Sequence, residues 1–277
     1  MKRRIPTILI LMVMVLVGAM YWVDLTYHTD PATGFILRGE VWWRYAVVAL
    51  PIVMCLLGLR TVGPRAIAVL RTKNSALGGV MLASAVFGVG YGAARLLTGV
   101  AVSDGYSLVL GALCVWYGVW MFLSAVQLFT QNTPSPTKSA VCGLVASFPF
   151  VAITVNRILL HPSSLYRVAP VVSAVSALLA IQWFGLLLRS LYISLPRRRV
   201  RWMYLAGVFS FLFSTCLELP HSIYLAMVGK ATGMDVFEAI FMAVFGLVGG
   251  CVSMAIAGQS AEQESMDVPL LHRKPGI

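Results

Sequence analysis

Charged residues are scarce in this sequence, and acids are scarcer than bases. Only 11% of the 277 residues are Asp, Glu, Lys or Arg, and only 10 are acids, whereas a soluble domain carries about a quarter charged residues. Hydrophobic residues make up 59% of the chain, and the mean hydropathy is +0.86. No polar stretch is long enough to build a core of its own, so a separate soluble domain is excluded.

The sequence signatures of several enzyme classes are also missing. The chain has no Walker loop, nucleophile elbow or HExxH motif, which argues against an ATP-driven engine and makes an enzyme less expected than a non-catalytic protein. The five cysteines form no CxxC pair, so neither a disulfide framework nor a structural zinc site is indicated. We expect no cofactor.

A glycine run that resembles a nucleotide-binding motif has a different interpretation here. Gly88-x-Gly90-x-Gly92 lies inside an apolar stretch with no preceding strand, so it does not satisfy the context that a dinucleotide fingerprint requires. Small residues four apart allow membrane helices to approach closely. We therefore expect Gly88-xxx-Gly92 and Gly246-xxx-Gly250 to lie at helix–helix contacts.

Long apolar windows are what the sequence has in abundance. A hydrocarbon core about 30 Å thick requires about 20 apolar residues per helical span. The windows are continuously apolar, whereas the strands of a membrane barrel alternate between apolar and polar residues. The sequence predicts an all-α, polytopic transmembrane helix bundle of about eight spans in a lipid bilayer, at residues 5–23, 41–59, 76–97, 107–129, 139–160, 168–193, 202–225 and 235–257.

The distribution of the basic residues predicts the orientation. With the N-terminus inside, 15 of the 21 Lys and Arg fall on the cytoplasmic side and 6 on the outer side, as the positive-inside rule expects for short loops. The net charge of +11 is thus explained by topology and not by a nucleic-acid partner. We predict that both ends lie in the cytoplasm.

The two ends of the chain carry further predictions. The apolar run 5–23 is long and lacks a clear small-x-small cleavage site, so we expect an uncleaved first span. Residues 258–277 are polar and are expected to form a disordered cytoplasmic tail. Short loops and the absence of an Asn-x-Ser/Thr sequon favour a bacterial inner (cell) membrane.

The seventh window is the most informative. At 100° per residue, its polar side chains fall within an arc of about 140°. Glu218 lies too deep for its short carboxylate to reach the interface, and an ionisable residue at such a depth normally faces protein or water. The residues of this predicted polar face are Ser210, Ser214, Thr215, Glu218, His221 and Ser222.

Basic partners for Glu218 are available at similar depth. Arg95 in the third window and Arg157 in the fifth could each neutralise it through a bidentate contact, although each could also extend to the membrane surface. Glu218-x-x-His221 is half of the motif that di-metal bundles use twice, and we expect no metal. The predicted ligand-binding residues of an outward-facing polar pocket are Arg95, Asn156, Arg157, Glu218 and His221.

Three functions remain open from the sequence. The first is a membrane protein that binds or transports a small polar or anionic solute, with Glu218 or His221 coupling protonation to binding. The second is a non-catalytic membrane subunit or sensor, in which the polar cluster is structural and another membrane protein is the partner. An intramembrane metal-dependent hydrolase is the third and the least favoured.

Overall fold

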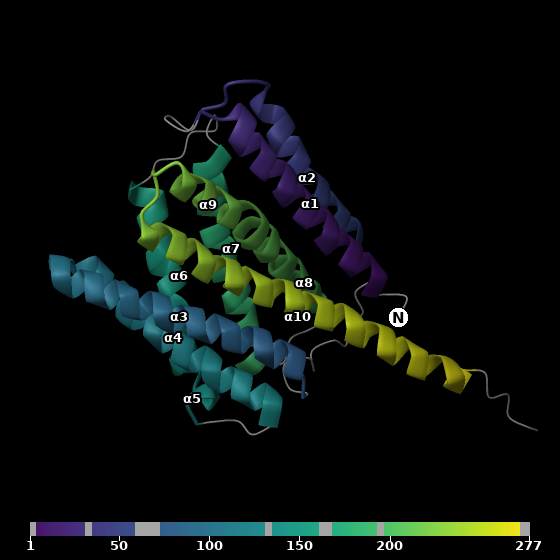
Figure 1. Cartoon of the computed structure of the whole chain (residues 1–277). Helices are drawn as coiled ribbons and strands as arrows, with labels where there is room; N and C mark the ends of the chain where they lie inside the picture. Colours follow the sequence, from purple (N-terminus) through teal and green to yellow (C-terminus); the bar gives the residue numbers. More distant parts are fainter. Residues whose placement is uncertain are drawn as a thin grey trace, which may run out of the picture.

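A computed structural model of the chain describes residues 4–30, 35–58, 73–130, 135–160, 168–192 and 197–271, and most of these residues are helical. Figure 1 shows them arranged as a bundle. The helices are α1 (Arg4–His28), α2 (Val41–Gly58), α3 (Ser75–Val102), α4 (Gly105–Thr130), α5 (Ser135–Lys138), α6 (Ala140–Leu160), α7 (Val168–Tyr192), α8 (Arg197–Ser210), the π-helix η3 (Phe211–Glu218), α9 (Leu219–Met227) and α10 (Gly233–Leu271).

The predicted fold class is confirmed. Seven helices of the described chain are long and apolar enough to cross a membrane, and α2 adds a shorter apolar helix, Val41–Leu57. One of the seven, Val200–Met227, combines most of α8 with η3 and α9. The chain is therefore a multi-pass membrane protein of about eight spans. Because successive spans run in opposite directions, the C-terminal ends of α1, α3, α6 and α9 lie on one side of the bundle, the predicted outer side.

The last helix is longer than the predicted span. Residues 235–257 lie within α10, which continues to Leu271 and extends past the rest of the bundle in Figure 1. The side chains beyond Gly258 lie outside the described part of the chain, so the disordered tail stays a prediction.

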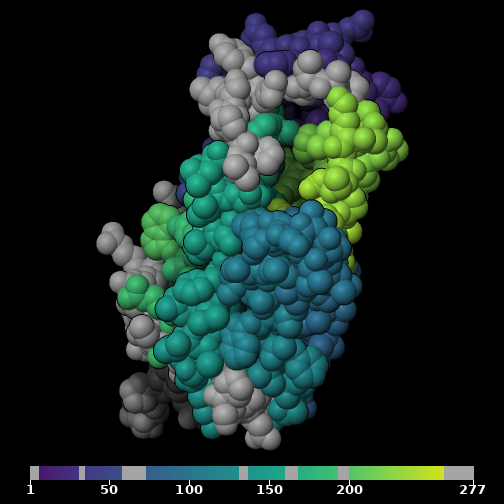
Figure 2. All heavy atoms as spheres, turned by 90° about the vertical axis from the view of Figure 1, so that its left-hand side faces the viewer, coloured from purple at the N-terminus to yellow at the C-terminus, as the bar shows by residue number. Residues whose placement is uncertain are grey.

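Glycines bring α3 and α4 into close contact, as expected from Gly88-xxx-Gly92. A Cβ added to Gly92 would lie 2.7 Å from the carbonyl oxygen of Gly111, and one added to Gly118 would lie 2.8 Å from that of Ala85. Such distances leave room only for glycine, because the two backbones themselves are in contact. With α6, this hairpin forms much of the near face in Figure 2.

The centre of the bundle is aromatic. Tyr117, Phe150, Phe184 and Phe245 are each 0% exposed, and the ring centroids of Phe150 and Phe245 lie 4.3 Å apart. The side chains come from α4, α6, α7 and α10, so this cluster joins the α3–α4 hairpin to the other half of the bundle.

The π-helix η3 lies where α10 and α1 press against the seventh span. Gly246 of α10 packs on the carbonyl oxygen of Ser210, and a Cβ there would lie 2.7 Å from that oxygen. Pro220 follows η3 within α9, and its missing N–H removes the donor that an α-helix would offer to the carbonyl of Cys216. The wider π turns occur immediately before this proline, and the Cys216 carbonyl lies against Gly18 of α1.

Candidate functional site

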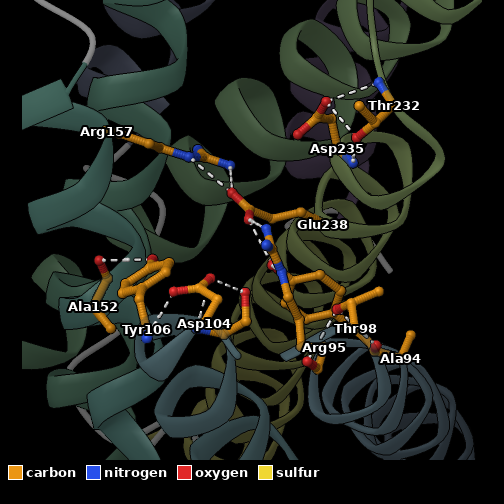
Figure 3. Close-up of polar contacts among 12 residues, drawn as sticks. Ala94, Arg95, Thr98, Asp104, Tyr106, Ala152, Arg157, Thr232, Asp235 and Glu238 are labelled. Carbon is orange, nitrogen blue, oxygen red and sulfur yellow. Dashed lines mark hydrogen bonds and ion pairs between the residues drawn. The ribbon is translucent and has the colours of Figure 1, made fainter. Parts of the chain in front are cut away.

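Four charged side chains from four elements, one of them buried and three half-buried, meet near the predicted outer side of the bundle. We call Arg95 of α3, Arg157 of α6, Glu218 of η3 and Glu238 of α10 the charged junction. Arg95 Nη2 lies 3.1 Å from Glu238 Oε2, and Arg157 Nη2 lies 3.0 Å from Glu238 Oε1. Figure 3 shows Glu238 between the two arginines.

Arg157 also holds the second carboxylate of the junction. Its Nη2 lies 2.5 Å from Glu218 Oε1, and its Nη1 donates a hydrogen bond of 2.9 Å to the carbonyl of Ser173 on α7. The other oxygen of Glu218 accepts a hydrogen bond from the hydroxyl of Ser176, which also lies 3.1 Å from the hydroxyl of Ser214. Arg157 is thus the shared cation of two carboxylates.

A tyrosine completes the other end of the junction. The Tyr91 hydroxyl donates a hydrogen bond of 2.6 Å to Glu238 Oε2 and accepts one of 2.8 Å from Arg95 Nε. Tyr91 is itself 0% exposed and stacks on Phe241. This packing fixes the position of the hydroxyl between acid and base.

The junction is closed and electrically balanced. Its two arginines and two glutamates sum to zero formal charge, and each carboxylate oxygen has a hydrogen bond or an ion pair. In a medium of low dielectric constant, an unpaired charge is costly and a compensated set is tolerated. Exposure of the side chain decreases along the junction, from 17% for Arg95 through 12% for Glu238 and 11% for Arg157 to 5% for Glu218. The Arg95 end is therefore the more accessible one.

The structure brings together three of the five predicted site residues. Arg95, Arg157 and Glu218 belong to the junction. Asn156 lies beside Arg157 on α6, but within the described part of the chain the hydrogen bonds of Arg157 go to Glu238 and to the Ser173 carbonyl and not to Asn156. His221 lies elsewhere, in the lining of a small cavity with Asp24 and Arg44.

Glu218 and His221 contact different parts of the bundle. Residues 219–221 continue as an α-helix after the π-helix, so the two side chains point about 60° apart around the helix axis. The polar side chains of the seventh span therefore do not all share the same neighbours. Thr215 donates to the Ala243 carbonyl on α10, Glu218 faces α6 and α7, and His221 faces a cavity lined from α1, α2 and α7.

Glu238 is the central residue that sequence reasoning missed. It lies in the first turns of the last predicted span, where an acid is expected at the outer surface. Its position inside the apolar window, one turn beyond Asp235, could have indicated that Glu238 needs a buried partner. Tyr91 lies four residues before Arg95 and shares its helix face, which the spacing alone indicates. Ser176 gave no such signal, because hydroxyl side chains are common within spans.

Asp104 caps the helix that follows α3, close to the Arg95 end (Figure 3). Its carboxylate accepts hydrogen bonds from the hydroxyl and backbone N–H of Ser107 and from the backbone N–H of Tyr106. These bonds favour the charged form, the one from the Ser107 hydroxyl most strongly, and hold the pKa of Asp104 below its ordinary value. The cap fixes the turn that carries α3 into α4.

Comparisons with family models, with curated proteins and with solved structures find no match to this chain. No cluster of three or more His, Cys, Asp or Glu side chains suited to a metal ion occurs among the residues whose placement is described.

Proposed function

We propose that this chain is a transporter that binds a small anionic solute together with a proton at the charged junction. The observation that carries the proposal is that Arg95 and Arg157, from different helices, converge on the one carboxylate of Glu238. A solute carboxylate has the same shape and charge as this side chain and can form the same bidentate contacts with guanidinium groups.

Charge balance supplies the coupling to a proton. The junction is neutral, so an added anion would leave one uncompensated negative charge in a medium of low dielectric constant. Protonation of a junction carboxylate at the same time keeps the sum at zero. Glu238 is the residue that we expect to be displaced, because it is paired to both arginines and is more exposed than Glu218.

The groups around Glu238 suit such an exchange. When Glu238 takes up a proton and moves aside, the Tyr91 hydroxyl and Arg95 Nη2 lose their acceptor and can donate to the solute. Arg157 keeps its pairing with Glu218 throughout, so it does not become unpaired. We expect the solute to enter from the Arg95 end and, given the short loops, place the protein in a bacterial inner membrane.

A second function is favoured by a specific observation. Hydrogen bonds and ion pairs occupy the carboxylate oxygens of the junction, as they would if it served only to hold α3, α6, η3 and α10 together. The chain would then be a non-catalytic membrane subunit, and the junction would exchange nothing.

Thermal stabilisation by added solute distinguishes the two functions. Purified protein would be heated with acetate, lactate, succinate or phosphate, with glycine as a zwitterionic probe, at pH about 5.5 and about 8. We expect at least one carboxylate to raise the midpoint of unfolding, and to do so more strongly at the lower pH, because binding of ligand to the folded state stabilises it.

Glu238→Gln separates the roles of proton and anion. The amide is uncharged like the protonated acid, so this variant should bind the anion at both pH values with little difference between them. Asp235→Asn, one turn earlier on the same helix and away from the junction, is the matched control and should keep the pH dependence of the unaltered chain. Stabilisation by none of the carboxylates, at either pH and in either protein, would favour the structural function.

A further inference from the structure

A second polar site lies between the α1–α2 hairpin and the rest of the bundle. A cavity of about 200 Å³ is lined mainly by apolar side chains, among them Val17, Val47 and Val48. A smaller one of about 30 Å³ reaches His221 of α9. Tyr21, Asp24, Arg44 and Val168 line both cavities, so the two adjoin around these residues.

Several polar atoms at this place lack a hydrogen-bonding partner within the described chain. They are the hydroxyl of Tyr21, Nη1 of Arg44 and Nδ1 of His221. Tyr21 is only 7% exposed, and a buried polar group without a partner is destabilising by about 1–3 kcal/mol. Three such atoms around two adjoining cavities indicate that an additional hydrogen-bonding group belongs there.

The charges around the two cavities indicate whether the missing hydrogen-bonding group is charged or neutral. Both oxygens of Asp24 are engaged by Arg44, through Nε and through Nη2 at 2.7 Å, so the pair is neutral. His28 Nδ1 lies 3.7 Å from the same carboxylate. Among the described residues that line the two cavities, Arg44 is the only arginine or lysine, and Asp24 already neutralises it. A second carboxylate or a phosphate would therefore add an uncompensated negative charge there. An uncharged hydroxyl can accept from Arg44 Nη1 and exchange hydrogen bonds with Tyr21 and His221.

The volumes of the two cavities indicate the size of the ligand's polar and apolar parts. The smaller cavity exceeds the 10–15 Å³ that one water molecule requires by this measure, which suits a hydroxyl group. The larger cavity exceeds the roughly 150 Å³ of an apolar cavity that accepts benzene. Two of its lining residues, Met20 and Trp43, are 58% and 72% exposed, so it borders the surface that faces lipid.

We propose that this site binds an uncharged amphiphile with a hydroxyl head and a hydrocarbon chain, taken from the bilayer. The head lies among Tyr21, Arg44 and His221, and the chain lies between α1 and α2 against Val17, Val47 and Val48. This site is separate from the charged junction and does not depend on the function proposed there.

Photolabelling in phosphatidylcholine nanodiscs tests the proposal. The probe is a dodecanol that carries a diazirine in its chain, and labelled peptides are identified by mass spectrometry. We expect labelling on α1 and α2, competition by unlabelled dodecanol, and at least about tenfold weaker competition by dodecanoic acid or dodecane. Equal competition by the acid or the alkane would overturn the proposal, because neither supplies an uncharged hydroxyl.

Three variants locate the site. Tyr21→Phe removes only the unpartnered hydroxyl and should weaken competition by dodecanol about three- to tenfold. Val48→Trp fills the apolar cavity and should abolish labelling of α2. Tyr27→Phe, on the same helix but 71% exposed, is the control and should behave like the unaltered chain. Unchanged competition in Tyr21→Phe would contradict the proposed position of the head, whether or not Val48→Trp folds.

Discussion

The charged junction and the α1–α2 site use the same kind of ion pair in opposite surroundings. In the junction, Arg157 is 11% exposed and its two carboxylate partners are 12% and 5% exposed. Hydrogen bonds from Tyr91 and Ser176 complete the environment of the two carboxylates. In the α1–α2 site, the side chain of Asp24 is 26% exposed and Arg44 Nη1, Tyr21 and His221 lack partners among the described residues.

The difference follows from how closely the helices approach. Glycines bring backbones into contact along α3–α4 and along α10, so side chains between these helices are held in one arrangement. The α1–α2 hairpin instead leaves cavities beside Tyr21. In a site whose polar atoms all have partners, a ligand can bind only by displacing one of those partners. In a site whose polar atoms lack partners, a ligand can form hydrogen bonds to them directly.

Loss of the central arginine should have the largest effect. Arg157→Met leaves Glu218 and Glu238 buried without their shared cation, and we expect a loss of about 3–5 kcal/mol in the free energy of unfolding. Arg44→Met should be destabilising by about 1 kcal/mol or less, because Asp24 can reach water. Chemical unfolding of both purified variants measures the contrast. Similar losses in the two would remove the distinction between the sites.

Close helix packing is tested on a single helix. Gly92→Ala places a Cβ 2.7 Å from the backbone of α4, whereas Gly79→Ala meets nothing within 4 Å. We expect Gly92→Ala to be destabilising by about 1–3 kcal/mol, as overpacked cores are, and Gly79→Ala to have little effect. Thermal unfolding in one detergent provides the comparison. An unaffected Gly92→Ala would mean that α3 and α4 can separate easily.

Removal of one tyrosine hydroxyl from each site compares a hydroxyl that has hydrogen-bonding partners with one that does not. Tyr91→Phe breaks hydrogen bonds to Glu238 and Arg95, and we expect a destabilisation of about 1–2 kcal/mol. Tyr21→Phe removes a hydroxyl without a partner in the described chain and should be neutral or stabilising in the absence of an amphiphile. If Tyr21→Phe were more destabilising than Tyr91→Phe, the hydrogen bonds would be assigned to the wrong tyrosine.

The smallest effect is expected at the Asp104 cap. Because its folded-state pKa is lowered, Asp104 stabilises the folded state at neutral pH, and this contribution is lost as pH falls through the lowered value. Asp104→Asn should therefore reduce the decline of the unfolding midpoint between neutral pH and about pH 3. Thermal scans across that range measure the slope. An unchanged slope would mean that Asp104 contributes nothing to acid sensitivity.

Much of the fold could be predicted because the length and apolarity of a sequence window identify a membrane-spanning helix. Each predicted window overlaps a described helix, and the glycine pairs lie at close contacts. The π-helix could not be predicted from periodicity, although Pro220 marked where regular hydrogen bonding fails. Periodicity also does not show that Glu218 and His221 have different neighbours, because this depends on how the surrounding helices pack against the seventh span.

The candidate site could be predicted only in part. Glu218, Arg95 and Arg157 were identifiable because an ionisable residue inside a span requires a partner. Glu238 was not, since an acid one turn inside a helix end is equally compatible with the interface. The α1–α2 site depends on side chains from α1, α2, α7 and α9, and no periodicity within one helix indicates which residues of the others face it.

Proton uptake on anion binding tests the central claim most directly. In weakly buffered solution with a pH indicator dye, addition of the stabilising carboxylate should remove about one proton per bound anion, because the junction must stay neutral. Glu238→Gln should bind the anion with no uptake. Binding without uptake in the unaltered protein, at the junction residues, would contradict the account.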